Sequence, residues 1–150
     1  MAGYIDIHTH AFPDPIAKVA IPALEREGGI KAYLDGTVAG LLASMDRGGI
    51  EQSVLCSIAT RPEQFAPILE WSKEIRSERI VPFPSLHPAD PDLLAHLQMI
   101  HDEGFKGIKM HSYYQLVEIR LETSVFSSGC GNLLAFRFRS PSHYPTARKH

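Results

Sequence analysis

The sequence predicts an α/β fold built on parallel strands, from three observations. Strand-like apolar segments begin at residues 52, 79 and 105, at spacings of 27 and 26 residues. A helical pattern lies between each pair, and a further strand-like segment opens the chain at residues 4–8. Strands that alternate with helices at this spacing are typical of βαβ units. The spacing alone does not distinguish an open sheet from a closed barrel.

In the first half of this predicted βαβ series, proline and glycine residues mark the ends of the strand and the helices. Pro13 and Pro15 end the opening strand, because proline donates no backbone hydrogen bond. Residues 16–35 are ambiguous, and one interpretation is a helix that is broken at Gly28–Gly29. Residues 38–45 carry apolar side chains at helical spacing, and Gly48–Gly49 ends that helix.

The second half repeats the pattern. Residues 52–59 are expected to form a buried strand, and a helix follows Arg61–Pro62. Residues 79–86 are the third strand, although Pro82 and Pro84 do not suit a strand ladder. The next helix is expected to start at Asp90–Pro91 and to end at Gly104, before a fourth strand over residues 105–111.

The opening strand carries polar side chains on one face only. Alternate residues of a strand share a face, so Asp6, His8 and His10 point together while Ile5 and Ile7 point the other way. Two imidazoles tilting inward at a strand end can both reach one ion, and Asp6 can orient a ligand or a bound water without touching the ion. The alternative is a pair of ordinary hydrogen-bonded histidines near a surface strand end.

The Asp6-x-His8-x-His10 pattern on a first strand resembles the opening of the amidohydrolase superfamily. The phrases RGGIEQSVLCSIAT, VPFPSLHPADPD and GFKGIKMH resemble the next three strands of its branch of amidohydrolase-related hydrolases and aminocarboxymuconate-semialdehyde decarboxylase-like enzymes. The resemblance implies a (β/α) barrel of the TIM type, of which residues 1–115 are the first four β/α units. It also implies that His8 and His10 bind a divalent metal, which we expect to be zinc. The substrate implied by the resemblance is a small molecule.

Further candidate residues follow the third and fourth strands, where barrel enzymes place their active sites. Lys109 resembles the carbamylated, metal-bridging lysine of some members, or binds an anionic substrate group, or is an ordinary inward lysine with a salt-bridge partner. His111 is a candidate third ligand or substrate contact. We expect His87 to stabilise a turn. We expect His96 and His101 in a solvated or rim position, and Tyr113 and Tyr114 either to line the barrel mouth or to cover its rim.

The expected chemistry is that of a metal-dependent hydrolase. A bound metal lowers the pKa of its water, and the activated water attacks an amide, ester or lactone. Two alternatives stay open: a metal-dependent decarboxylase of the same branch, and a truncated, non-catalytic fragment. The second arises because a full barrel takes about 250 residues. The strand-five histidine and the strand-eight aspartate of the family have no counterpart in the 150 residues.

Residues 116–150 differ from the rest and are expected to form an irregular tail. They hold 2 acidic and 5 basic residues (net +3), against 15 acidic and 10 basic (net −5) in residues 1–115, which sum to −2. One hypothesis is that this stretch is translated out of the family's reading frame. The alternative is a genuine, divergent tail.

Composition excludes some partners. The net charge of −2 does not suit a nucleic-acid binder, and no apolar run is long enough for a membrane span. The two cysteines give no disulfide framework, so a cytoplasmic location is expected. A half barrel exposes strand edges, and a homo-oligomer through those edges is therefore possible.

Overall fold

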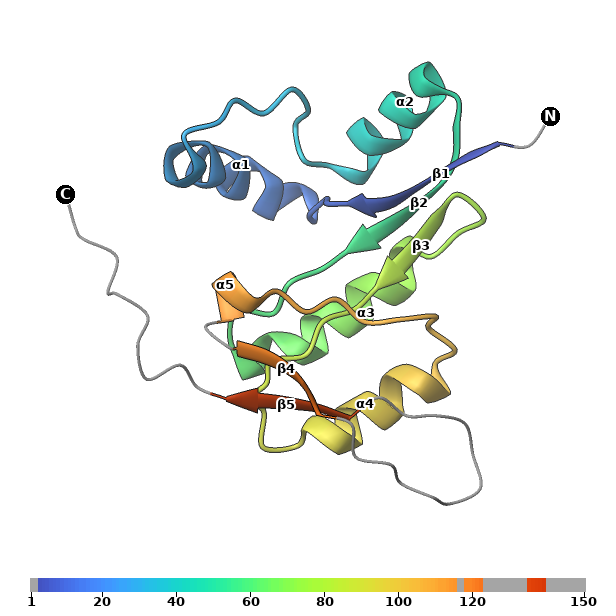
Figure 1. The fold of residues 1–150 in the computed structure, drawn as a ribbon. Coiled ribbons are helices and arrows are strands. Elements are labelled where there is room, and N and C mark those ends of the chain that lie inside the picture. The colour runs from blue at the N-terminus through green and yellow to red at the C-terminus, as the bar shows by residue number, and fades with distance from the viewer. Residues whose placement is uncertain (1–2, 116–117, 123–134, 140–150) are drawn as a thin grey trace.

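Three parallel strands form the central sheet. The computed structural model describes residues 3–115, 118–122 and 135–139. The sheet order is β1 (Tyr4–Thr9), β2 (Ile50–Cys56) and β3 (Ile80–Phe83), and both pairings are parallel. All three arrows run the same way in Figure 1, toward the end at which α1 and α5 lie. The prediction of an α/β fold with parallel strands is confirmed; what the structure shows of it is a small open sheet.

The helices begin and end near the predicted residues, except for the last, α5, which was not predicted. They are α1 (Asp14–Gly28), α2 (Val38–Gly48), α3 (Phe65–Ile75, after the 3₁₀ turn η1, Pro62–Gln64), α4 (Leu93–Asp102) and α5 (Ser112–Gln115). The Thr37 hydroxyl accepts the amide of Gly40 at 2.9 Å and so caps α2. Gly49 ends α2 in the left-handed conformation, with φ of 64°. The ambiguous residues 16–35 start as a helix that ends at Gly29 in the same way.

Two apolar clusters join the helices to the sheet. In the first, α2 packs on β2 through Leu41, Met45 and Leu55, with Ala11 and Ile80. In the second, α3 meets α4 through Phe65, Leu69, Leu86 and Ile100. Burial of these side chains is the main favourable term that holds the carboxyl ends of the strands in place.

The predicted fourth strand, residues 105–111, is wrong as an element. Only one parallel bridge forms, between Ser85 and Lys109. Lys109 N donates to Pro84 O at 2.8 Å, and the Ser85 hydroxyl donates to Lys109 O at 2.8 Å. Pro84 has no N–H to donate, so one backbone bond of a regular parallel ladder cannot form beside this bridge. The prolines of the third strand also explain why β3 ends at Phe83 rather than at residue 86.

The tail is not irregular throughout. β4 (Glu118–Glu122) and β5 (Ala135–Arg139) pair antiparallel, apart from the parallel sheet. The irregular tail expected for residues 116–150 is therefore wrong for these ten backbone positions, where alternation of apolar and polar residues (EIRLE, AFRFR) suits a two-stranded ladder. The other residues of 116–150 lie outside the described part of the chain. No helix among the described residues is long and apolar enough to cross a membrane.

Candidate metal site at the end of β1

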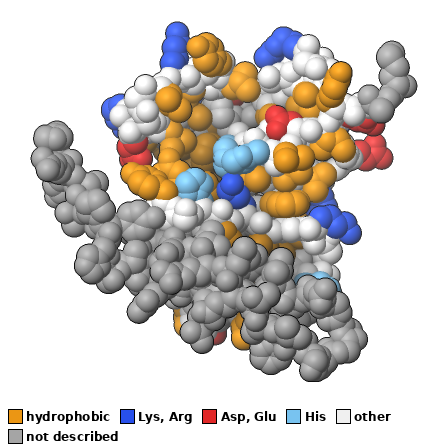
Figure 2. Space-filling view, in the orientation of Figure 1, with side chains coloured by type: hydrophobic (Ala, Val, Ile, Leu, Met, Phe, Trp, Pro, Cys, Tyr) orange, Lys and Arg blue, Asp and Glu red, His pale blue; other side chains and the backbone are white. Residues whose placement is uncertain are grey.

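His8 and His10 meet at the carboxyl end of β1. Their Nε2 atoms lie 3.1 Å apart, and the ring centroids lie 4.9 Å apart at an interplanar angle of 65°. The two side chains therefore project from the same side of the chain, as the alternation of the strand predicts. Histidine and lysine or arginine side chains gather at the centre of the face drawn in Figure 2, between hydrophobic side chains.

The backbone of β2 fixes the tautomer of His10. His10 Nδ1 lies 2.8 Å from the carbonyl oxygen of Cys56, and a carbonyl only accepts. Nδ1 therefore carries the proton and donates it. In the neutral ring Nε2 is then a bare acceptor, and its lone pair faces Nε2 of His8. This orientation of a ligand nitrogen by a carbonyl behind the ring is common in metal sites. This contact could not be predicted from the sequence, because every residue has a carbonyl.

Lys109 completes a cluster of three nitrogens. Its Nζ lies 3.0 Å from Nε2 of His8. The Lys109 ammonium only donates, so its contact requires a lone pair on His8 Nε2. That lone pair then faces the lone pair on His10 Nε2, and no proton lies between the two rings. If His8 Nε2 is instead protonated and donates to His10 Nε2, the Lys109 ammonium faces an N–H group rather than a lone pair. Neither protonation state satisfies both contacts, whereas a cation between the rings would satisfy both imidazoles.

The surroundings keep His10 neutral. Partial burial lowers the pKa of His10, and the nearby positive charges of His8, Lys109 and His111 lower it further, while the bond to Cys56 O opposes the shift. A neutral imidazole is the form that binds a metal. Burial also raises the pKa of the Cys56 thiol, so that this thiol is protonated and unreactive at neutral pH.

Asp6 lies beside the cluster but does not contact either ring. Its carboxylate accepts the backbone N–H of His8 at 3.0 Å. This bond holds the backbone at His8, so Asp6 supports the strand end rather than a ring nitrogen. The predicted role of Asp6 in orienting a ligand or a bound water stays a prediction.

His111 lies near the site and is held by a residue that the sequence analysis missed. Its backbone N–H donates to Gln115 Oε1 at 2.8 Å. Gln115 Nε2 donates to Ala59 O at 2.9 Å and to Leu86 O at 2.7 Å, and Gln115 is only 2% exposed. One side chain therefore ties together the segments that follow β2, β3 and residue 111. A glutamine directly after two tyrosines carries no pattern that could have predicted this.

The pocket in front of the cluster has a volume of about 430 Å³. His8, His10, His111 and Tyr114 line one part of it, and the apolar side of α1 lines another through Ala20, Ile21, Ala23 and Leu24. Tyr114 also packs against the His111 ring, with centroids 4.7 Å apart. Tyr114 thus lines the mouth, as expected, whereas Tyr113 is 61% exposed and packs on Tyr114.

The other histidines lie away from this pocket. His87 Nδ1 accepts the amide of Ala89 at 3.1 Å, which confirms its role in a turn. The His101 side chain is 82% exposed, as predicted. The solvated position predicted for His96 is wrong: it is 25% exposed, bonds Asp90 at 2.7 Å and stacks on Phe65 at 3.8 Å. Residue 96 turns inward because Asp90 and Phe65 give it both a polar and an apolar partner.

The donor set fits half of a metal site. Nitrogen ligands on a tetrahedral zinc lie about 3.3 Å apart when each Zn–N bond is about 2.0–2.1 Å, close to the separation of the two Nε2 atoms. Within the described ranges, no group of three or more His, Cys, Asp or Glu side chains is placed to hold an ion. Since catalytic zinc usually has three protein ligands, His8 and His10 would supply two of the three.

Comparisons with family models, with curated proteins and with solved structures found no match to this chain. The resemblance to the amidohydrolase superfamily therefore rests on the sequence motifs alone.

Proposed function

We propose that this chain binds a divalent metal, zinc by preference, through His8 and His10, and that it is the metal-binding part of an amidohydrolase-type hydrolase. The observation that carries the proposal is the 3.1 Å approach of the two Nε2 atoms, one of which is fixed as an acceptor by Cys56 O. The expected (β/α) barrel belongs to the same proposal, with the open sheet of β1, β2 and β3 as its first strands.

Each residue of the site has a distinct task in this proposal. When bound, the metal supplies an activated water and polarises the carbonyl of an amide, ester or lactone. His8 and His10 hold it, and Asp6 holds the backbone at His8. The Lys109 ammonium, 3.0 Å from His8, attracts an anionic group of a small-molecule substrate into the pocket. His111 lines that pocket and is a substrate contact in this proposal. A decarboxylase reaction on a carboxylated substrate would use the same residues.

A second candidate is a chain that binds metal without turnover. The observation that favours it is the absence of a third His, Cys, Asp or Glu ligand in the part of the chain that the structure describes. Catalysis needs a complete, fixed ligand set as well as a bound ion.

Metal titration tests the shared part of both candidates. The chain is stripped with a chelator, dialysed and titrated with Zn²⁺ by calorimetry, beside the variants His8→Ala, His10→Ala and His101→Ala. We expect one ion per chain, at least about tenfold weaker binding in the first two variants, and no change in the third, whose side chain is exposed on α4. Equal affinities in all four proteins would overturn the proposal.

Assays with the zinc-loaded chain separate the candidates. Hydrolysis of esters, lactones or amides that carry an anionic group supports the hydrolase if it is lost in His8→Ala. Release of CO₂ from an aromatic acid supports the decarboxylase. Zinc binding without either product supports the non-catalytic candidate.

A further inference from the structure

A second pocket borders His10 and shares Phe12, Ile58 and Thr60 with the first pocket. Its volume is about 340 Å³, and it is bounded by the segment after β1, the segment after β2 and one side of α3. A cavity of about 150 Å³ holds one benzene ring, so this pocket has room for a ring with a substituent. Other residues that line it, among them Ser57, Ile68 and Trp71, do not line the first pocket.

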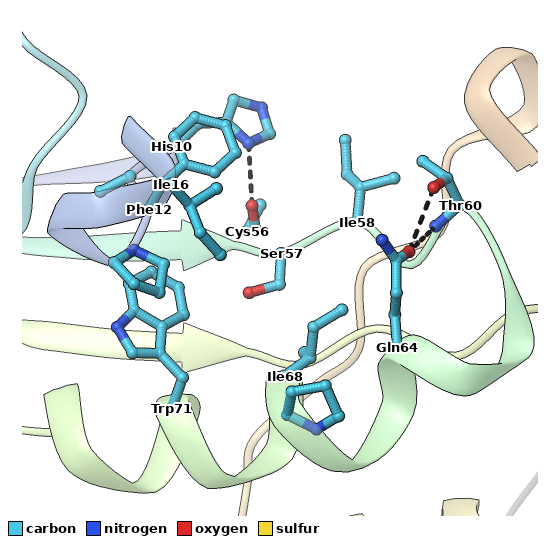
Figure 3. Close-up of a pocket in the computed structure, with 13 residues that line it drawn as sticks. His10, Phe12, Ile16, Cys56, Ser57, Ile58, Thr60, Gln64, Ile68 and Trp71 are labelled. Atoms are coloured by element: carbon cyan, nitrogen blue, oxygen red, sulfur yellow. Dashed lines mark hydrogen bonds between the residues drawn. The ribbon is translucent and has the colours of Figure 1, made fainter. Parts of the chain in front are cut away.

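The walls of the pocket are apolar and partly aromatic. Figure 3 shows Phe12 and Trp71 on one side and Ile58 and Ile68 on the other. None of the lining residues, all within the described part of the chain, is an Asp, Glu, Lys or Arg. A charged ligand would lose its hydration here without gaining a partner of opposite charge, so the pocket suits a neutral one.

Ser57 brings a polar group into this apolar space. The residue is 9% exposed, and its Oγ is buried with no hydrogen-bond partner among the described residues. Figure 3 shows the hydroxyl turned toward the space between Trp71 and Ile68. A buried hydroxyl without a partner costs free energy, and a ligand oxygen would remove that cost.

Gln64 offers a second donor on the same pocket. Its Oε1 accepts from Thr60 N at 2.6 Å, Thr60 Oγ1 at 3.1 Å and Arg61 N at 3.3 Å. The two backbone donors fix which end of the amide is oxygen, so Nε2 lies on the opposite side, toward Ile58 in Figure 3. No acceptor for Nε2 occurs among the residues that the structure describes. Ser57 Oγ from a buried position and Gln64 Nε2 from a partly exposed one can both donate to a ligand with an acceptor oxygen.

We propose that this pocket binds a neutral, single-ring aromatic compound that carries a carbonyl group, with the ring against Phe12 and Trp71 and the carbonyl oxygen toward Ser57 and Gln64. The proposal goes beyond the metal-dependent function and does not depend on it. Binding needs no metal and leaves Nε2 of His10 facing His8.

Trp71 gives a direct readout, because it is the single tryptophan of the chain and lines the pocket. The full chain is titrated with benzamide in a buffer that contains a chelator, and the Trp71 emission is recorded. We expect a saturable change at one site per chain. Benzoate, which has the same ring but a negative charge, is expected to bind at least about tenfold more weakly.

Serine variants test the assigned hydrogen bond. Ser57→Ala should weaken benzamide by about five- to tenfold and leave toluene, which has no acceptor, unchanged. Ser53→Ala is the matched control, since Ser53 is another buried, unpartnered serine of β2 that does not line the pocket. Gln64→Glu keeps the acceptor oxygen and removes the amide donor, so it should also weaken benzamide. Ile68→Phe fills the pocket and should abolish binding of both ligands.

The outcomes separate this proposal from the metal site. Benzamide binding that survives in His8→Ala supports an independent pocket. No saturable change in Trp71 emission, or equal benzamide affinity in wild type, Ser57→Ala and Ile68→Phe, would overturn the proposal, and neither result bears on zinc binding.

Discussion

The Nζ of Lys109 lies 3.0 Å from the Nε2 of His8, although the two residues are 101 positions apart in the sequence. The segment that bears Lys109 reaches this position through a single bridge to Ser85 beside β3, not through a strand. The ammonium donates to the lone pair that a metal would use. Lys109 and a bound cation therefore compete for His8, unless the lysine is itself converted to an anionic carbamate.

Lys109→Met tests this competition. Removing the ammonium frees His8 Nε2 and removes a repulsive positive charge, so we expect zinc affinity at pH 7 to rise several-fold in bicarbonate-free buffer. Lys106→Met, which removes an exposed lysine three residues away, is the control and should leave the affinity unchanged. A fall in affinity in Lys109→Met would instead mean that Lys109 contributes to binding the ion.

Gln115→Ala should destabilise the chain markedly. The substitution leaves the carbonyls of Ala59 and Leu86 and the amide of His111 without their present partner. We expect a loss of about 2–3 kcal/mol in the free energy of unfolding, measured by urea denaturation. Gln98→Ala on the exposed side of α4 is expected to cost less than about 0.5 kcal/mol. Equal stability of the two variants would show that Gln115 does not hold the strand ends together.

Asp90 should make stability depend on pH below about 4. Burial alone would raise the pKa of Asp90, but hydrogen bonds from His96 and from the amide of Asp92 outweigh it and hold the pKa below 3.8. A depressed carboxyl pKa stabilises the folded state above the unfolded-state value of about 3.9, and this contribution disappears as the pH falls through the folded-state value.

Asp90→Asn therefore lowers stability most at pH 6, by about 1.5–3 kcal/mol, and the difference from wild type shrinks as the pH falls below about 4. Urea denaturation at several pH values measures it. Asp92→Asn, an exposed neighbour at the start of α4, should show no such pH dependence. A constant difference at all pH values would contradict the assignment.

The edge of β1 should promote self-association. Among the described residues β1 pairs only with β2, and its Tyr4, Ile5 and Ile7 side chains are 72%, 59% and 77% exposed. An exposed apolar edge strand is a site for pairing with another chain. We expect an oligomer in size-exclusion chromatography with light scattering. Ile7→Lys should shift it toward monomer, whereas Leu94→Lys, at a 79% exposed position on α4, should not. A wild-type chain that runs as a monomer would contradict this prediction.

The sequence predicted the strands and helices best where local signals were strong. The Thr37 cap and Gly49 fix the ends of α2 through their own backbone geometry, and the alternation of β1 places His8 and His10 together. Residues 105–111 were predicted less well, because a strand needs a partner with free donors and Pro84 has none. His96 was misplaced since its partners, Asp90 and Phe65, lie on other elements.

The sequence by itself determined the parallel α/β pattern and the pairing of two histidines on one strand, because both follow from the period of the backbone. Only the tertiary structure decided that Cys56 O orients His10, that Lys109 reaches His8 and that Gln115 joins three segments. These contacts join residues 46, 101 and 56 positions apart, and no local pattern encodes which distant groups the packing of helices on a sheet brings within hydrogen-bond distance.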